Sequence, residues 1–219
     1  SMNAVLVNYN YDPTWLVDYP ELNPVIIYDR SDDGVERDLT KYGTVYKTEN
    51  IGNVDYDKLG YLIENYEKLP EVFLWSKSNL SKFITKEEFD VVKDNTDFTP
   101  LLTRNHAIYT DNSMPNGGVN IVNAYDTQGM YYERFGIVNT LHQIMPWKHY
   151  KLWEDWCLKF NLPRAAMIPF PPGGSFILTR ERVHRYAVDY YKEMRNTLDY
   201  AQLPLEAYFC ERSYFLMWK

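Results

Sequence analysis

Two hydroxyls and one amine stand together at Ser76, Lys77 and Ser78, directly after the apolar run 72–75. A short apolar run of this kind is typical of a strand that is covered on both faces. Open α/β sheets bind their ligands outside the carboxyl ends of the strands, so we expect the chemistry at this polar end. Lys77 could offset the charge of a phosphate there as a point cation, or it could be a solvated surface amine.

A carboxylate and a guanidinium, Asp29 and Arg30, follow a second apolar run at 25–28. A carboxylate at the end of a strand can accept two hydrogen bonds from sugar hydroxyls or from the N–H of a base. The alternative is a turn without a ligand, because the Asp-Gly pair at 33–34 is typical of turns. Both interpretations of Asp29 stay open at this point.

Asn50 and Gly52 follow a third short strand, 44–47, and precede a helix. Glycine at this place could let backbone N–H groups approach a phosphate or a ribose. Apolar residues recur at three- and four-residue spacing from 59 to 69, which predicts a helix with one apolar face. Asp55 is expected as the N-cap of this helix.

The alternation of strands with helices or loops predicts an α/β fold with a mostly parallel, Rossmann-like sheet flanked by helices. We expect one domain, 1–219, because this length can build one substantial core. The expected strands cover 4–8, 24–28, 44–47, 72–75 and 176–178. Between 85 and 139 we expect irregular structure with one short helix at 86–93. The last third is expected to be helical, at 147–160, 180–198 and 205–218.

Composition narrows the classes of function. The formal net charge of −7 argues against a nucleic-acid partner, which a basic face would bind. No segment approaches the ~20 apolar residues of a membrane span, and Ser1-Met2 resembles an expression scar. Cys157 and Cys210 stand in apolar contexts typical of buried thiols, which fits a soluble protein of the reducing cytoplasm. The 20 tyrosines could bind sugars or fill the core and its edges.

Several motifs in order resemble one family. Residues 7–10 with Trp15-Leu16 resemble V-x-Y-N-E-D-x-x-W-L, and 25–29 resemble V-x-I-Y-N-K. Residues 50–52, 65–66 and 69–70 resemble N-V-G-R-E-G-H-T-Y-L and N-Y-D-x-L-P-D-V. Residues 174–183 resemble G-x-F-x-V-S-R-E-R-I, and 211–218 resemble E-R-x-W-x-x-x-F. The family is an uncharacterised group of glycosyltransferase-like domains, related in pattern to GT-A nucleotide-sugar transferases.

The resemblance implies a GT-A-like glycosyltransferase that moves a hexose or pentose from a nucleotide-sugar donor to a hydroxyl of a glycan or glycoprotein. We predict that the donor is bound by Tyr9, Asn10, Asp29, Arg30, Asn50, Gly52, Ser76 and Lys77. We predict the acceptor site at Gly173, Gly174 and Ser175. Transfer with inversion needs a general base, and Glu211 of the terminal motif is the first candidate, with Glu206 the second. The alternative for Glu211 is an ion pair with Arg212 or Arg180.

One departure from the family's pattern affects the prediction of a metal site. GT-A enzymes usually carry an Asp-x-Asp pair that binds Mn²⁺ or Mg²⁺ at the strand end, where this chain has 76–78, Ser-Lys-Ser. We therefore assign no metal ligand, although a divalent metal stays possible at other carboxylates. The departure also favours an alternative function, a non-catalytic carbohydrate- or protein-binding module on a degenerate glycosyltransferase fold.

Overall fold

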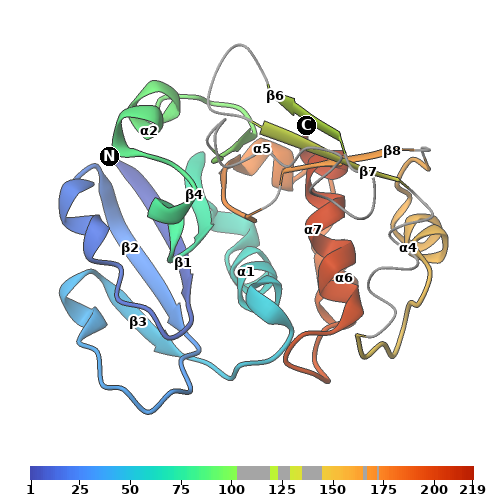
Figure 1. Ribbon diagram of the computed structural model, residues 1–219, viewed down its shortest axis with the longest axis horizontal. Helices are drawn as coiled ribbons and strands as arrows, with labels where there is room; N and C mark the ends of the chain where they lie inside the picture. Colours follow the sequence, from blue (N-terminus) through green and yellow to red (C-terminus); the bar gives the residue numbers. More distant parts are fainter. Residues whose placement is uncertain (103–118, 123–128, 135–144, 165–166, 172) are drawn as a thin grey trace.

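The structure, a computed structural model, describes residues 1–102, 119–122, 129–134, 145–164, 167–171 and 173–219. Its main sheet has six strands in the order β3-β2-β1-β4-β9-β5 (Figure 1). The strands are β1 (Met2–Asn8), β2 (Leu22–Asp29), β3 (Thr44–Lys47), β4 (Val72–Lys77), β5 (Thr99–Pro100) and β9 (Phe176–Thr179). β1 pairs in parallel with β2 and β4, and β3 pairs in parallel with β2, while β9 runs antiparallel to β4 and β5. The α/β class and the mostly parallel sheet are confirmed.

Side chains of the central strands alternate between two cores, as the two-residue period of a strand requires. Val5 and Trp75 belong to one hydrophobic core, and Leu6 and Leu74 belong to the other. All four side chains are at most 1% exposed. This burial on both faces explains why the strands read as continuous apolar runs in the sequence.

Helices cover both faces of the sheet. They are α1 (Asn53–Glu64), α2 (Lys86–Val92), α4 (Trp153–Phe160), α5 (Arg180–Val183), α6 (Val188–Arg195) and α7 (Leu205–Trp218). Short 3-10 turns are η1 (Thr14–Asp18), η2 (Leu39–Lys41), η3 (Tyr66–Lys68) and η4 (Leu80–Lys82). The expected helical C-terminal part is confirmed, and α1 lies beside α6 and α7 in Figure 1. Within the described residues, no helix combines the length and the apolar character that crossing a membrane requires.

A second, antiparallel sheet was not predicted from the sequence. Its strands are β6 (Val119–Val122), β7 (Gly129–Arg134) and β8 (Met167–Phe170), in that order. The first two fall in the stretch 85–139 that we expected to be irregular, so that expectation is wrong for them. The rest of that stretch is described only at 85–102, which contains the expected short helix as α2 and the two-residue strand β5.

The structure corrects two expected helices. The helix expected at 180–198 is divided into α5 and α6, and the break is stabilised by tyrosine hydroxyls that replace helical donors. Tyr191 donates to the carbonyl of Val183 at 2.5 Å, and Tyr66 donates to the carbonyl of Tyr186 at 2.6 Å. The helix expected at 147–160 begins only at Trp153. The backbone N–H groups of residues 148–150 instead donate to the carboxylate of Glu206, so they are satisfied without a helix.

A lysine amine lies in the core between α1 and the sheet. Lys58 is fully buried, and its Nζ lies 3.8 Å from the ring centroid of Trp75 and donates to the carbonyl of Gly174. Asp55, one turn earlier and also buried, accepts a hydrogen bond of 2.6 Å from the Tyr214 hydroxyl of α7. Asp55 is therefore not the N-cap that we expected, because its side chain holds α7 against α1. Gly52 takes the N-cap position.

Removing the Lys58 amine should change how stability depends on pH. Burial lowers the pKa of Lys58 from 10.5 to about 7, so the unfolded chain binds one more proton between these values. The free energy of unfolding then rises with pH in that window, by about 1.4 kcal/mol per pH unit for one proton. Urea titrations of wild type and Lys58→Met should diverge from about pH 7 toward pH 10.5. Buried thiols such as Cys157 titrate in both proteins, so their contribution cancels in the difference between the two stability curves.

Lys68→Met is the matched control, because Lys68 is exposed. Its stability curve should run parallel to that of the wild type. Parallel curves for Lys58→Met as well would show that the amine of Lys58 keeps its ordinary pKa in the folded protein.

Candidate functional site

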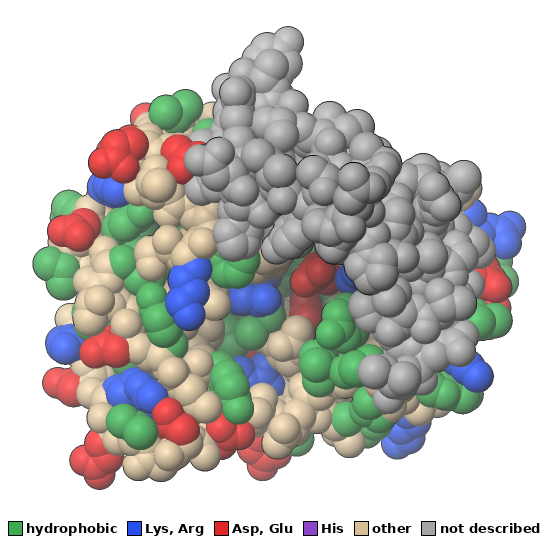
Figure 2. Space-filling view, in the orientation of Figure 1, with side chains coloured by type: hydrophobic (Ala, Val, Ile, Leu, Met, Phe, Trp, Pro, Cys, Tyr) green, Lys and Arg blue, Asp and Glu red, His purple; other side chains and the backbone are tan. Residues whose placement is uncertain are grey.

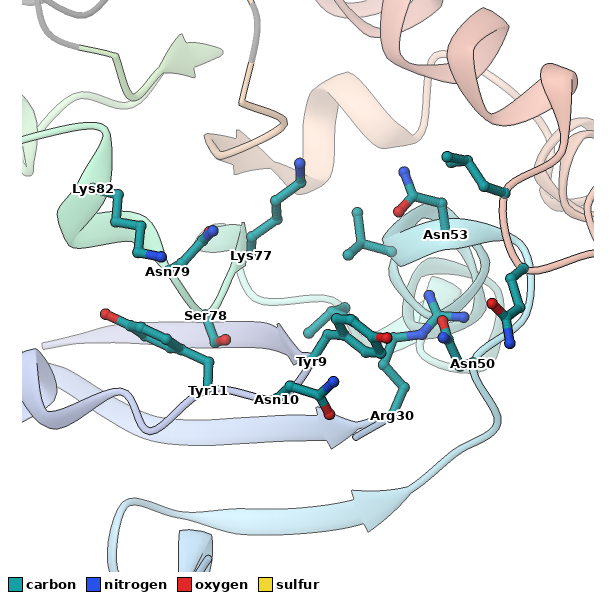
Figure 3. Close-up of a pocket in the computed structure, with 14 residues that line it drawn as sticks. Tyr9, Asn10, Tyr11, Arg30, Asn50, Asn53, Lys77, Ser78, Asn79 and Lys82 are labelled. Carbon is teal, nitrogen blue, oxygen red and sulfur yellow. The ribbon is translucent and has the colours of Figure 1, made fainter. Parts of the chain in front are cut away.

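A pocket of about 420 Å³ opens at the carboxyl ends of β1 and β4 (Figure 3). The chain leaves β1 for β2 on one side, and β4 lies on the other, so this is the point where the strand order reverses. Ligands of open α/β sheets bind at such a point, because the loops there diverge and leave a crevice. The pocket is lined by Val7, Tyr9, Asn10, Tyr11, Arg30, Asn50, Asn53, Val54, Lys77, Ser78, Asn79, Lys82, Gln202 and Leu203.

The pocket is cationic although the chain is acidic. Arg30, Lys77 and Lys82 line it, and no Asp or Glu occurs among the described residues of the lining. Lys77 and Lys82 form no ion pair with a described residue, whereas Lys47 and Arg37 nearby are paired with Asp29 and Asp33. Figure 2 shows Lys and Arg side chains gathered in the middle of this face. This local excess of positive charge makes the pocket suitable for an anionic ligand.

Two tyrosine rings contribute flat surfaces to the lining. Tyr9 is 46% exposed, and the Nζ of Lys82 lies 5.2 Å from the ring centroid of Tyr11. A hydrogen bond with Asp32 raises the pKa of the Tyr9 hydroxyl. Such rings offer an apolar face to a base or a sugar and a hydroxyl for hydrogen bonding.

Asp32 also holds two amides of the rim in place. Its carboxylate accepts from the side-chain amide of Asn10 at 3.2 Å and from that of Asn50 at 3.0 Å. The loops that follow β1 and β3 are thereby tied to the loop that follows β2. These hydrogen bonds, first among them the one from Asn50, hold the pKa of Asp32 below its ordinary value.

The buried side chain of Asn8 joins the ends of three strands beneath the pocket. Its Nδ2 donates to Asp29 Oδ1 of β2 at 3.2 Å, and its Oδ1 accepts from the hydroxyl of Ser78, which follows β4, at 2.6 Å. Asn8 is 0% exposed. The only sequence signal for this role is an amide at the end of an apolar strand, and we did not single it out.

Asp29 lies beneath the pocket and is not one of its lining residues. Besides Asn8 it accepts from the Ser31 hydroxyl at 2.6 Å and from Lys47 Nζ at 2.8 Å. Burial alone would raise the pKa of this carboxyl, but the hydrogen bonds from Lys47, Ser31 and Asn8 outweigh burial and lower it. The structure thus gives Asp29 a supporting position, and its predicted contact with a nucleotide stays a prediction.

The other residues predicted for the donor divide into two groups. The pocket lining includes Tyr9, Asn10, Arg30, Asn50 and Lys77. Gly52 and Ser76 lie behind it. Gly52 has φ +70°, and an added Cβ would lie 2.9 Å from the Cβ of Leu198, so glycine is required there for close packing. The buried Ser76 hydroxyl lies 2.9 Å from the hydroxyl of Ser175.

The residues predicted for the acceptor lie next to Lys77 but outside the lining. Gly174 has φ +66°, and an added Cβ would lie 3.5 Å from Cε of Lys77. Gly173 has φ +100°, and Ser175 is buried. The carbonyl of Gly174 accepts from Lys58, so this loop is fixed to the core rather than presented freely.

The two candidate bases lie in different surroundings. Glu206 is 0% exposed and accepts hydrogen bonds from the backbone of Lys148, His149 and Tyr150 at 2.7–3.1 Å and from the hydroxyl of Tyr200. A carboxylate with both oxygens occupied in this way fixes a loop. The Glu211 side chain is 24% exposed, and its Oε1 lies 3.4 Å from Nη1 of Arg212. Neither residue is part of the pocket lining.

Residues distant in the sequence complete the pocket and were missed. Gln202 and Leu203, which precede α7, form one wall together with Asn53 at the start of α1. The carbonyl of Gln202 accepts from the backbone N–H of Asn53 at 2.8 Å, and that of Ala201 accepts from Gly52 at 2.8 Å. No local pattern marks these residues, because they meet only in the folded chain. Lys82 and Asn79 follow β4 directly and could have been included with Lys77.

No group of three or more His, Cys, Asp or Glu residues suited to a metal ion occurs in the described part of the chain. Comparisons with protein-family models, curated proteins and solved structures find no match for this chain. The interpretation of the site therefore depends on the geometry and charge of its own residues.

The two buried hydrogen bonds of the Asn8 side chain should contribute to the stability of the fold. Asn8→Ala leaves the buried Ser78 hydroxyl without its acceptor and removes one of the donors to Asp29, which should lower the free energy of unfolding by about 1–3 kcal/mol. The control Asn50→Ala removes an exposed hydrogen bond and should cost less than about 1 kcal/mol. Urea unfolding of both variants measures the difference. Equal stability of the two variants would contradict the role of Asn8.

Proposed function

We propose that this protein is a glycosyltransferase that binds a nucleotide-sugar in the pocket at the ends of β1 and β4. The observation that carries the proposal is the lining itself, in which Lys77 and Lys82, with no ion-pair partner among the described residues, lie with the Tyr9 and Tyr11 rings. The lysines suit a diphosphate, and the rings suit a nucleoside. The motifs shared with glycosyltransferase-like domains support the same class of ligand.

The proposed reaction breaks the bond between the anomeric carbon of the sugar and the diphosphate oxygen, and forms a bond from that carbon to an acceptor oxygen. Negative charge develops on the departing diphosphate, where Lys77 and Lys82 stabilise it. The acceptor hydroxyl loses its proton to a carboxylate, for which we keep Glu211 as the candidate. The acceptor approaches along the loop Gly173, Gly174 and Ser175, which lies beside Lys77.

A binding module without catalysis is the second candidate. The absence of an acidic residue from the described pocket lining, and the Glu211–Arg212 contact, favour it. Both candidates bind a ligand in this pocket, and they differ in turnover. A panel of UDP-, GDP- and CMP-sugars, screened for thermal stabilisation and then for release of the nucleotide, separates them.

Removing a pocket cation should weaken nucleotide binding. Lys77→Met deletes one charge that faces the diphosphate and should raise the Kd of the stabilising nucleotide about 10-fold, since 1.4 kcal/mol is a factor of ten. Because amines rather than carboxylates line the pocket, binding measured by calorimetry should persist in EDTA and change little with Mn²⁺. Lys68→Met, outside the pocket, is the matched control. Unchanged affinity in Lys77→Met, or affinity lost in EDTA, would contradict this account.

Neutralising Glu211 should separate catalysis from structure. If Glu211 is the base, Glu211→Gln loses about 10²–10⁴ in turnover while its melting temperature is retained. Glu206→Gln is the structural comparison, because it weakens four hydrogen bonds of a buried carboxylate and should lower the melting temperature. Sugar-transfer assays and thermal unfolding on both variants measure the two effects. Full turnover of a stable Glu211→Gln protein would remove Glu211 from the reaction.

A further inference from the structure

The guanidinium of Arg30 is buried at the pocket with part of its hydrogen-bonding capacity unused. Arg30 is 1% exposed, and its Nη2 donates to the carbonyls of Glu49, at 3.1 Å, and Ile51. Its Nε and Nη1 are buried and have no hydrogen-bond partner among the residues that the structure describes. A buried cationic donor without a partner is costly, and an anionic ligand oxygen is the group that would satisfy it.

Among the described residues, the carboxylate that forms an ion pair with Arg30 is that of Asp57, and it does not satisfy these donors. Asp57 Oδ2 lies 3.9 Å from Nε, which is an ion pair but too long for a hydrogen bond. The same oxygen accepts a hydrogen bond of 2.8 Å from the Thr48 hydroxyl. Burial lowers the pKa of Arg30, and Asp57 acts against that shift, so the guanidinium stays charged. Positive charge is therefore held in place, and the buried Nη1 has unused hydrogen-bonding capacity.

The start of α1 lies on the same side of the pocket. Asn53 and Val54 line it together with Arg30, and no side chain in the described part of the chain caps this helix of twelve residues. The backbone N–H groups of Gly52 and Asn53 already donate to Ala201 and Gln202, but the helix dipole still leaves partial positive charge at this end. The helix end and the unpartnered guanidinium are independent features that favour the same kind of ligand.

Arg30 also lies where two pockets join. It lines the 420 Å³ pocket and a neighbouring pocket of about 580 Å³, and Asn50 and Gln202 belong to both linings. Figure 3 shows Lys77 and Lys82 on one side of the first pocket and Arg30 with Asn50 on the other. A ligand that extends from one pocket into the next passes Arg30.

We propose that Arg30 and the N-terminus of α1 form a second oxyanion subsite, separate from Lys77 and Lys82. This inference rests on the proposed function and deepens it, because the ligands of the site then carry an anionic group besides the diphosphate. A phosphate or a carboxylate, on the transferred sugar or on the acceptor, has the required chemistry. Nη1 is buried, so a side chain of the rim must move before the incoming group can reach it, and Tyr9, which is 46% exposed, lines the same pocket.

The test uses inorganic phosphate as the probe and the side-chain N–H signals of ¹⁵N-arginine-labelled wild-type protein as the readout. Arg30→Lys assigns the Arg30 signal. Phosphate should shift this signal saturably, and it should do so also in Lys77→Met and in the presence of saturating UDP. Arg37, which lies outside the pocket lining and is paired with Asp33, is the internal control and should not respond.

Two results would overturn the second subsite. One is an Arg30 signal that phosphate leaves unmoved, and the other is a shift that saturating UDP abolishes, since the nucleotide's own phosphates would then occupy Arg30. If no nucleotide binds at all, the proposed function fails, and the phosphate titration still decides the subsite. Arg30→Gln, if folded, should bind phosphate at least about 10-fold more weakly, whereas Arg37→Gln should match the wild type.

Discussion

The amide of Asn8 is the contact on which the arrangement of the pocket depends. It receives one hydrogen bond from the loop after β4 and gives one to the carboxylate at the end of β2, so three neighbouring strands end in register. Both bonds are buried, and without Asn8 the Ser78 hydroxyl loses its acceptor while Asp29 loses one of its donors. The parallel ladders of β1 with β2 and with β4 bring the strand ends to one edge, and Asn8 fixes their relative positions there.

A second polar cluster connects this edge with the C-terminal helix. Lys58 and Asp55 of α1 lie in a core dominated by aromatic rings, where Trp75 packs against Tyr214 at 4.9 Å between centroids. Burial raises the pKa of Asp55 while the Lys58 amine opposes that shift, so the two groups depend on each other for their charge. Because Lys58 also holds the carbonyl of Gly174, the loop beside Lys77 is coupled to the same cluster.

Electrostatics explains how an acidic chain can present a cationic pocket. Carboxylates near the site are engaged elsewhere: Asp29 by Lys47, Asp33 by Arg37, and Asp32 by rim amides. The cations of the lining are left without such partners among the described residues, apart from the long Arg30–Asp57 contact. Local charge therefore differs in sign from the net charge of −7, and it is the local field that an approaching anion meets.

The sequence alone determined the elements with strong local patterns. Continuous apolar runs indicated β1, β2 and β4, because strands buried on both faces have no polar side to show. Spacing of three and four residues indicated α1, and the rule for open sheets located the pocket at the ends of these strands, including Lys77, Tyr9 and Asn50. The function of this pocket is a proposal. The sequence motifs support it, but they do not determine it.

Only the tertiary structure decided the contacts between distant segments. It divided the helix expected at 180–198, because tyrosine hydroxyls satisfy the carbonyls at the break, and it paired β9 antiparallel to β4. It turned Asp55 from an expected cap into a partner of Tyr214, and it surrounded Glu206 with backbone N–H groups. Gln202 joined the pocket through a backbone hydrogen bond to Asn53, 149 residues earlier in the chain (202 − 53). The physical reason is the same in each case: burial and hydrogen-bond satisfaction depend on neighbours in space, which a local pattern does not contain.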